Sequence, residues 1–280
     1  MDNNSHTDAP EPAADAEYRY ERFTTQLLFR DLRFQSAEVK VGDRLPMTEM
    51  FTIDGDRVSM ADLAAGRPVL LVFGSVSCPM TASAIPVLTD LHGEFGERIE
   101  FVMVNVREAH PGEHYPQPGT LDRKLDHAKA LADLYPVPWA IVSDDIEGHL
   151  HRSLDPKPNS AFIIDAEGTI VFRALWASDR RALRQALASV AKGEKPERSE
   201  STTLLGPVFM AMGRVQSVME RAGPQALSDL WRSAFPMAVA GRVAPLFSPL
   251  SPDQRGIAAV LTLTLVLVII LASIGLWVFF

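Results

Sequence analysis

The spacing of apolar residues changes along this chain. Residues 69–76, "VLLVFGSV", are apolar at nearly every position, which is typical of a central strand covered by helices on both faces. Pro79 then stands where a helix could begin, and the apolar positions after it recur every three or four residues: Ile85, Leu88, Leu91 and Phe95. This stretch predicts a buried strand that leads directly into a helix packed on the sheet.

The stretches on either side complete one α/β domain. Residues 51–54, a turn at 54–56, and then Val58 and Met60 predict a β-hairpin. The pattern next predicts a strand in "RIEFVMVNV", a helix in "LDRKLDHAKALADLY", a strand-like "WAIVSD", two strands in "SAFIIDAEGTIVFRA" and a helix in "SDRRALRQALASVAK", capped by Ser178 or Asp179. The order β, α, β, α, β, β, α is that of thioredoxin. We expect an α/β, thioredoxin-like domain over residues 40–192 with an N-terminal β-hairpin extension, plus a C-terminal single transmembrane helix.

The transmembrane prediction rests on residues 256–280, which are 25 residues without a charged side chain. As a helix at about 1.5 Å per residue, this run exceeds the roughly 30 Å of a bilayer core. The alternative is a buried core helix, which is disfavoured because apolar runs of about 18 or more uncharged residues are typical of membrane spans. We predict a single-pass membrane protein with a C-terminal tail anchor.

The N-terminal residues and the arginines before the apolar run indicate which side of the membrane the soluble domain faces. Residues 1–17 are acidic and rich in Pro, Ala and Asp, so we expect them to be disordered. They contain neither Lys nor Arg and no apolar stretch, which is the opposite of a signal peptide. Arg242 and Arg255 precede the apolar run, and positive charges favour the cytoplasmic side of a membrane. We therefore expect the soluble domain to face the cytoplasm.

Two segments flank the domain. Residues 18–39 interleave four arginines with aromatic residues and leucines, so this amphipathic segment either lies on an anionic membrane surface or packs on the domain as a helix. Residues 193–255 begin as a charged linker and continue as helical stretches broken by Pro207, Pro224 and Pro236. Their methionines offer an adaptable apolar surface for the membrane, the domain or a partner. The alternative is a semi-ordered spacer.

Composition narrows the range of partners. The formal net charge of −8 argues against nucleic acid as the main partner. Cys78 is the only cysteine, and Thr81 stands where a Cys-x-x-Cys pair would have its second cysteine. An intramolecular disulfide is therefore excluded, and any disulfide step must involve another molecule.

Cys78 stands between the strand at 69–76 and the helix that follows it. In this topology the junction lies at the C-terminal edge of the sheet, where helix amides favour the reactive thiolate. Ser75 and Ser77 can donate hydrogen bonds to the sulfur, and Pro79 has no amide proton at the helix start. The alternative is a small buried residue, which free cysteines usually are. Its place in the fold favours a reactive thiol.

Glu108 and His110 follow the second predicted strand, so their loop should open at the same sheet edge as the thiol. A carboxylate beside an imidazole can deliver or take a proton, although each alone is more often a solvated loop residue. His110 and His114 do not predict a metal site, because a Pro-Gly break separates them and no further ligand lies nearby at suitable spacing. We expect His149 and His151 at the surface.

Four stretches together resemble a known family. They are "RPVLLVFGSVSCPM", "VNVREAHPGE", "QPGTLDRKLDHAKAL" and "AIVSDDIEGHLHRSLDPKPNSAFIIDAEGTIVFR". In this order they are similar to the iodothyronine deiodinases, and more closely to the bacterial redoxin-like relatives of those enzymes. The resemblance covers roughly residues 40–192.

The resemblance implies roles for single residues. Cys78 matches the selenocysteine that attacks an aryl iodide and takes up the halogen in the animal enzymes. Ser77 would support this nucleophile, and Pro158 would lie near it. Glu108 and His110 would act as acid and orienter. The implied partners are a small-molecule substrate and an external thiol reductant such as thioredoxin or glutathione, with no bound cofactor.

The chain also departs from the family pattern. Sulfur replaces selenium, which should slow attack on a carbon–iodine bond, and Met80 stands where a second proline is expected. Pro118 falls where the animal enzymes have a downstream histidine, and His114 is the candidate substitute. The animal enzymes are anchored at the N-terminus and this chain at the C-terminus. These differences leave the natural substrate open.

Three functions fit these residues. The first is a membrane-tethered reductase of the deiodinase type, which removes a halogen from a small electrophile or otherwise reduces it. The second is a one-cysteine peroxidase in which Cys78 is oxidised to a sulfenic acid that a thiol then reduces. Ser75 lies three residues before Cys78, where peroxiredoxins have a Thr or Ser, but the preceding Leu-Val-Phe-Gly does not match the peroxiredoxin motif. The third is a non-enzymatic redox sensor or interaction module. As for oligomeric state, a homodimer is also compatible with the sequence.

Overall fold

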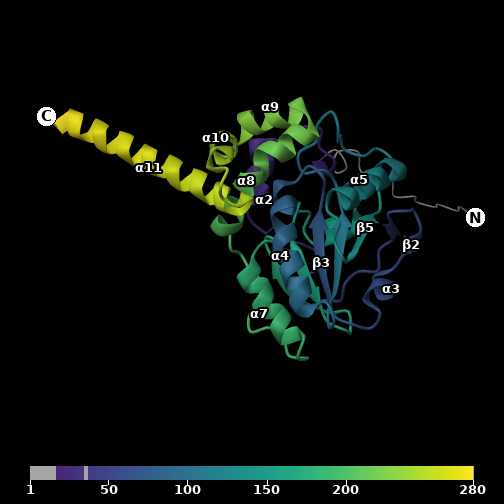
Figure 1. Cartoon of the computed structure of the whole chain (residues 1–280). Helices are drawn as coiled ribbons and strands as arrows, with labels where there is room; N and C mark the ends of the chain where they lie inside the picture. The colour runs from purple at the N-terminus through teal and green to yellow at the C-terminus, as the bar shows by residue number, and fades with distance from the viewer. Residues whose placement is uncertain (1–16, 35–36, 280) are drawn as a thin grey trace, which may run out of the picture.

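The computed structural model describes residues 17–34 and 37–279, and a mixed sheet of eight strands lies at the centre of this described part (Figure 1). The disorder predicted for residues 1–17 concerns residues that lie almost wholly outside it. The strands are β1 (Met50–Thr52), β2 (Arg57–Val58), β3 (Val69–Gly74), β4 (Glu100–Asn105), β5 (Ala140–Asp144), β6 (Ala161–Ile164), β7 (Ile170–Ala174) and β8 (Glu200–Ser201). Their order across the sheet is β2-β1-β5-β4-β3-β6-β7-β8.

Helices surround the sheet and continue beyond it. They are α2 (Thr25–Asp31), α3 (Met60–Ala64), α4 (Pro79–Phe95), α5 (Leu121–Leu134), α6 (His149–Ser153), α7 (Arg180–Val190), α8 (Leu205–Ala222), α9 (Pro224–Ser233), α10 (Phe235–Val243), the 3-10 turn η1 (Ala244–Phe247) and α11 (Pro252–Phe279).

β3 lies inside the sheet, parallel to β4 and antiparallel to β6, and all of its residues are buried. Its side chains alternate between the two faces because a strand has a period of two. Leu70 and Val72 pack with residues of α4, α5 and α7, whereas Leu71 and Phe73 pack on the other face with residues of α3 and α6. Cover on both faces explains why this run is apolar at nearly every position.

The topology is thioredoxin-like, which confirms the predicted fold class. The predicted hairpin forms as β1 and β2, and β1 extends the sheet by pairing antiparallel with β5. The three strand-like stretches predicted after the helix at 121–135 form as β5, β6 and β7; β5 pairs parallel with β4 inside the sheet, and the short helix α6 separates β5 from β6. β8, from the stretch predicted as a charged linker, pairs with β7 at the edge.

Helix α2 and helices α8, α9 and α10 form what we call the helical cap, which covers the start of α4 (Figure 1). Apolar residues of the cap, including Met212 and Leu230, share one buried cluster with Cys78 and Trp176. The guanidinium of Arg22 donates to the buried carboxylate of Asp229 at 2.6 and 2.9 Å, which ties the N-terminal segment to α9. In the structure both flanking segments thus pack on the domain.

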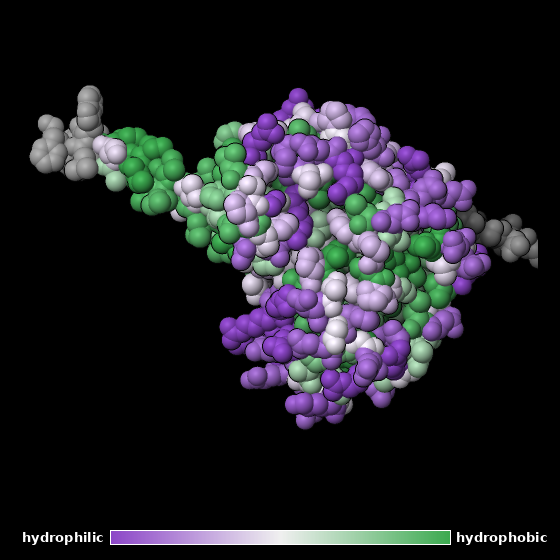
Figure 2. Space-filling model, in the orientation of Figure 1, coloured by the Kyte–Doolittle hydropathy of each residue, from purple (hydrophilic) through white to green (hydrophobic). Residues whose placement is uncertain are grey.

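Helix α11 projects from the cap (Figure 1), and after a first turn that carries Asp253 and Arg255 its coloured part is mostly hydrophobic (Figure 2). Residues Pro252–Ile274 are long and apolar enough to cross a membrane. The first turns of α11 cross α8 closely, since a Cβ at Gly213 would meet the carbonyl of Pro252 and a Cβ at Gly256 would meet the carbonyl of Phe209. The apolar helix is therefore joined to the same helix, α8, that covers Cys78.

Candidate active site

Cys78 is the N-cap residue of α4, at the junction expected from the sequence. Its backbone is extended, with φ −101° and ψ 114°, and Pro79 opens the first helical turn. The Sγ atom accepts a hydrogen bond from the amide of Thr81 at 3.4 Å. The sulfur therefore takes the place that a serine or aspartate oxygen usually has at a helix start.

Burial controls the acidity of this thiol. Only 1% of Cys78 is exposed, and the loss of water raises the pKa of its thiol from an ordinary value of 9.0 to about 11. Hydrogen bonds from Thr81 and the Met80 amide lower the pKa, but by less, and the carboxylate of Asp31 raises it further. Cys78 is therefore a neutral thiol at pH 7. The expected thiolate is wrong for this structure, because desolvation outweighs the helix amides.

A cavity of about 70 Å³ borders the sulfur. Its walls come from the start of α4, from the loops that carry His110 and Pro158, and from the helical cap. Most of the lining is apolar and includes Met80, Trp176, Met212, Leu230 and Met237. The cavity is thus a small apolar space that combines a thiol with very few polar groups.

Glu108 lies in the loop after β4 and is fully buried. One carboxylate oxygen accepts hydrogen bonds from the amide of Ser77 at 2.9 Å and from its hydroxyl at 2.5 Å. The other oxygen lies 2.9 Å from Nδ1 of His127 on α5. Gln117 holds the backbone of Glu108 through two further hydrogen bonds. The carboxylate is thus fixed between the residue next to Cys78 and a histidine.

His110 lines the cavity beside Cys78, but Glu108 binds His127 instead of the His110 ring. The His110 ring packs 4.2 Å from the ring of Phe23, and its buried Nδ1 has no hydrogen-bond partner among the described residues. Burial, helped by the positive charge of Arg107, lowers the pKa of His110 to about 3. The ring is therefore neutral at pH 7.

Arg107 also fixes the N-terminal segment to this loop. Its guanidinium donates to the hydroxyl of Tyr20 at 2.7 Å, and that hydroxyl donates to the carbonyl of Ala109 at 2.8 Å. The guanidinium lies 4.6 Å from the centre of the Tyr20 ring. These contacts place the N-terminal segment against the residues that carry Glu108 and His110.

The other predicted site residues are divided between two places. Pro79 and Pro158 line the cavity. The Ser77 hydroxyl donates to Glu108, and the Ser75 hydroxyl accepts from the amide of Ala109 at 3.3 Å, so both serines hold the Glu108 loop.

His114, the candidate substitute for a missing family histidine, is exposed. Its Nδ1 lies 2.9 Å from the carbonyl of Arg221, and it lines a separate outer pocket. The structure therefore does not bring His114 to the cavity.

Two site residues were missed from the sequence. His127 was not singled out, although Ala128 and Leu131 on the same helix stripe mark that face of α5 as buried. Asp31 lines the cavity, and burial raises the pKa of its carboxyl. Nothing in the local pattern signalled Asp31, because it reaches the cavity only through the long-range packing of α2.

His151 was expected at the surface and is buried. Its ring nitrogens lie 2.9 Å from the hydroxyl of Tyr18 and 2.7 Å from the carbonyl of Lys157. His149 is exposed and pairs with Asp145 at 2.9 Å. The prediction for His151 is wrong because Tyr18, 133 residues away in the chain, packs over it.

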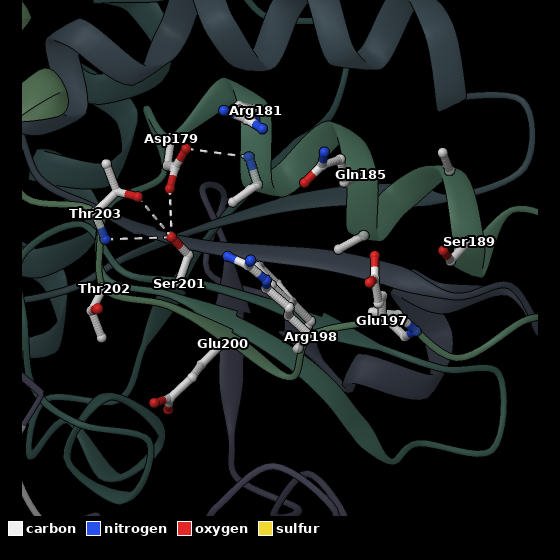
Figure 3. A pocket seen from close by; sticks show the side chains of 15 residues that line it. Asp179, Arg181, Gln185, Ser189, Glu197, Arg198, Glu200, Ser201, Thr202 and Thr203 are labelled. Atoms are coloured by element: carbon white, nitrogen blue, oxygen red, sulfur yellow. Dashed lines mark hydrogen bonds between the residues drawn. The ribbon is translucent and has the colours of Figure 1, made fainter.

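A larger hollow of about 920 Å³ lies between α7 and residues 196–203 (Figure 3). Its lining mixes polar and apolar side chains, and Ser201 donates to the carboxylate of Asp179 at 2.6 Å and contacts Thr203 at 3.0 Å. None of the predicted site residues lines it. The chemistry-bearing residues therefore converge at the smaller cavity.

A thioredoxin-like sheet, a thiol at the first strand–helix junction and a buried carboxylate from the next loop define the class of thioredoxin-like redox proteins. Within that class, the chain belongs to the iodothyronine deiodinase family, whose model matches residues 18–174, more than half of the chain. This confirms the resemblance found in the sequence. The match begins at residue 18 rather than near residue 40, so it includes the segment that brings Phe23 and Asp31 to the cavity.

Individual relatives match over shorter stretches. The type II iodothyronine deiodinase of Sus scrofa is 34% identical over 73 residues, which are 26% of this chain and 27% of that protein. Thyroxine 5-deiodinase of Gallus gallus is 34% identical over 82 residues, 29% of this chain and 31% of its own length. The matches therefore span less than a third of these deiodinases.

More distant relatives are also found. The methylamine utilization protein MauD of Methylobacillus flagellatus is 25% identical over 114 residues, 37% of this chain and 52% of that protein. Among solved structures, a hypothetical protein of Sinorhizobium meliloti superposes with a TM-score of 0.48 at 17% identity, over 60% of this chain and 93% of that one.

Proposed function

We propose that this chain is a membrane-anchored, thiol-dependent reductase of the deiodinase type that acts on a small apolar electrophile, with Cys78 as the nucleophile. One observation carries the proposal: the only thiol of the chain borders an apolar cavity, next to the residue that binds the buried Glu108. Family membership supports a redox reaction of this type.

The reaction follows from the groups present. For a halide substrate, the Cys78 sulfur attacks the halogen, the carbon–halogen bond breaks, a sulfur–halogen bond forms and the thiol proton leaves. A proton reaches the carbon, and Glu108 is the proposed acid. An external thiol then displaces halide from the sulfur to form a mixed disulfide, and a second thiol releases Cys78 as a thiol and leaves as a disulfide. Each cycle oxidises two thiols and reduces one carbon–halogen bond.

The cavity supports an apolar substrate, since its walls are methionine, leucine and tryptophan side chains. Its volume of about 70 Å³ is far below the roughly 300–1,000 Å³ of typical ligand pockets. Substrate entry therefore requires movement of the helical cap. His110, with its neutral ring and unpartnered Nδ1, is the proposed polar contact for the substrate.

The surroundings of the thiol also support the need for an external reductant. In a chain with one cysteine no internal thiol can resolve an oxidised Cys78. Thioredoxin or glutathione is the proposed source of electrons. We propose α11 as the anchor, with the domain in the cytoplasm; protease added to intact cells should then leave the domain uncut, and cleavage would contradict this orientation.

The test uses the purified full chain in lipid nanodiscs with a dithiol reductant. Turnover is measured with an iodoaromatic compound, with hydrogen peroxide and with a small disulfide, alongside Cys78→Ser. We expect iodide release that is lost in the variant. Iodide release that persists in Cys78→Ser would rule out the proposal. Consumption of peroxide alone would replace it with a one-cysteine peroxidase, and no turnover of any acceptor would favour a redox sensor.

A further inference from the structure

Large apolar side chains are exposed on the outer side of the helical cap, close to where α11 leaves it. They come from the end of α9, from α10, η1 and the start of α11, of which the last three pack against one another. We call them the outer apolar face: Trp231, Phe235, Leu246, Leu250 and Ile257. Their exposed fractions run from 37% to 77%. Figure 2 shows hydrophobic residues on the cap beside the base of α11. Apolar side chains gathered in this way mark a surface that contacts another body.

Helix α10 and η1 form one short apolar stretch, Phe235–Phe247. Its inner side is already occupied, because Ala238 and Ala240 belong to the buried cluster around Cys78. The stretch is too short to cross a bilayer, which takes about 20 residues. An apolar helix with one side packed on protein and large apolar side chains on the other suits a position in the plane of a membrane surface.

The packing of α11 determines how near the cap lies to a bilayer. Val260 and Leu263 are part of the candidate span Pro252–Ile274, and both pack against the buried cluster of the cap. At about 1.5 Å per residue they lie roughly 6 and 10 Å beyond Gly256, where the uncharged run begins. A headgroup layer is only about 5–7 Å thick. A span formed by α11 therefore brings the cap to the headgroups.

The charges around the outer apolar face suit an anionic surface. Residues 230–252 contain two arginines, Arg232 and Arg242, and no acidic residue, although the whole chain has a formal net charge of −8. Both arginines are exposed. The acidic residues on either side, Asp229 and Asp253, are each paired with an arginine. Exposed arginines beside aromatic and apolar side chains are typical of surfaces that bind anionic lipid.

We propose that the outer apolar face lies on a bilayer surface that contains anionic lipid, with its apolar side chains at the boundary of headgroups and acyl chains and with Arg232 and Arg242 against lipid phosphates. The inference rests on α11 as the proposed anchor and goes beyond it, because it assigns a membrane contact to the domain itself. Helices α9 and α10 also carry Leu230 and Met237, which line the Cys78 cavity. The cavity therefore lies directly behind the membrane contact.

The test measures the depth of single positions in a bilayer. Full-length protein with Cys78→Ser receives one new cysteine, at Leu246→Cys, at Val266→Cys in α11, or at Glu194→Cys, an exposed control beyond the end of α7. Each cysteine carries a nitroxide label, and the protein is placed in nanodiscs of phosphatidylcholine and phosphatidylserine. Electron paramagnetic resonance measures label collisions with oxygen, which dissolves in lipid, and with a nickel chelate, which stays in water. We expect the oxygen-to-nickel ratio to be several-fold higher for Leu246→Cys than for Glu194→Cys.

The label at Val266→Cys separates this inference from the proposed anchor. If the nickel chelate reaches that label, the anchor fails, while the Leu246→Cys label still decides whether the face binds lipid. If Val266→Cys is shielded but Leu246→Cys collides with the chelate as often as Glu194→Cys, the membrane contact of the cap is overturned and the anchor stands. A Leu246→Cys label shielded from both reagents and coupled to a second spin would show that another copy of this chain covers the face, which would also overturn the proposal.

A second comparison tests the role of the arginines. Arg232→Gln combined with Arg242→Gln should lower the ratio at Leu246→Cys toward that of Glu194→Cys, and so should nanodiscs of phosphatidylcholine alone. The matched control is Arg181→Gln, which removes an exposed arginine on α7 and should leave the ratio unchanged. Thermal melting should show that all variants fold. An equal ratio in both lipid mixtures, or in the double variant and its parent, would overturn the assignment to anionic lipid.

Discussion

At the scale of single residues, Cys78 and Glu108 are both buried but differ in their hydrogen bonds. Three donors, from Ser77 and His127, surround the carboxylate of Glu108. The sulfur of Cys78 accepts one amide hydrogen bond, from Thr81, in an otherwise apolar cavity. The surroundings of the sulfur therefore support a charge poorly, so Cys78 rests as a neutral thiol and must lose its proton before the sulfur can act as a nucleophile.

This difference gives a pH prediction for Cys78. Because burial raises the thiol pKa to about 11, the rate of alkylation in the folded protein should keep rising up to about pH 11. In urea the midpoint should return to near 9. The measurement is the iodoacetamide rate between pH 7 and 11 by mass spectrometry, and a folded-state midpoint below 9 would contradict the structure.

The same shift affects stability. The folded pKa lies above the unfolded one, so the contribution of the neutral thiol is fully present below pH 9 and is lost as the pH rises to about 11. Cys78→Ala should lose less stability than wild type over that interval. Thermal melting at pH 8 and pH 10.5 gives the comparison.

The sequence allowed part of the site to be predicted at this scale. Cys78 and His110 were predicted to lie near one another because their loops open at the same edge of the sheet, and the family resemblance implied that Pro158 lies near the thiol; all three line the cavity. The partner of Glu108 could not be predicted in the same way, because hydrogen bonding depends on side-chain direction. A carboxylate two residues before His110 binds His127, 19 residues further along.

At the scale of elements, α5 determines where His127 lies. Thr120 caps this helix, since its hydroxyl accepts from the amide of Arg123 at 3.3 Å. Thr120→Ala should lower the free energy of unfolding by about 1 kcal/mol. Thr120→Ser keeps the hydroxyl and should remain near wild type. Chemical denaturation of both variants tests this, and equal loss in both would mean that the cap does not matter.

Elements with strong patterns were predictable and weak ones were not. β3 and α4 have continuous or helical apolar periodicity, and both were predicted close to their observed positions. β8 has two residues, in a charged stretch that resembles a linker, and pairs only because β7 offers a free edge. Such a short strand depends on pairing with a neighbouring strand, so its own residues show no apolar pattern that would predict it.

At the scale of the whole molecule, the helical cap closes the cavity, and the contact between Arg22 and Asp229 helps to keep the cap closed. Asp229→Ala leaves the guanidinium of Arg22 and the amide of Phe23 without that partner. The cap should open more often, and Cys78 should be alkylated several-fold faster at pH 8. Asp90→Ala is the control, because it removes an ion pair with Arg180 that joins α4 to α7. Equal rates in the two variants would argue against cap opening as the route to Cys78.

The crossing of α8 and α11 gives a further prediction. A Cβ at Gly213 would meet backbone atoms of Pro252, whereas a Cβ at Gly206 of the same helix meets nothing within 4 Å. Gly213→Ala should therefore lower the melting temperature in nanodiscs. Gly206→Ala should leave it unchanged or raise it slightly, because alanine favours helix more than glycine does. A similar effect of both changes would contradict the close crossing.

The cap itself could only be described in outline from the sequence. The proline breaks and methionines of residues 193–255 indicated helical segments with an apolar surface, but several binding places were compatible with them. Packing against Cys78 depends on α2, α8 and α9 meeting from opposite ends of the chain. Contacts over such separations leave no periodic trace in any one segment.

The buried, protonated state of Cys78 also protects it between reaction cycles. Because the chain has one cysteine, an oxidised Cys78 cannot form an internal disulfide. Repeated oxidation would convert it to the sulfinic acid, which thiols do not reduce. Oxidants attack thiolates, and this sulfur is neutral and shielded from water at rest. The closed cap therefore protects Cys78 from over-oxidation, because oxidants reach the sulfur only while the cavity is open.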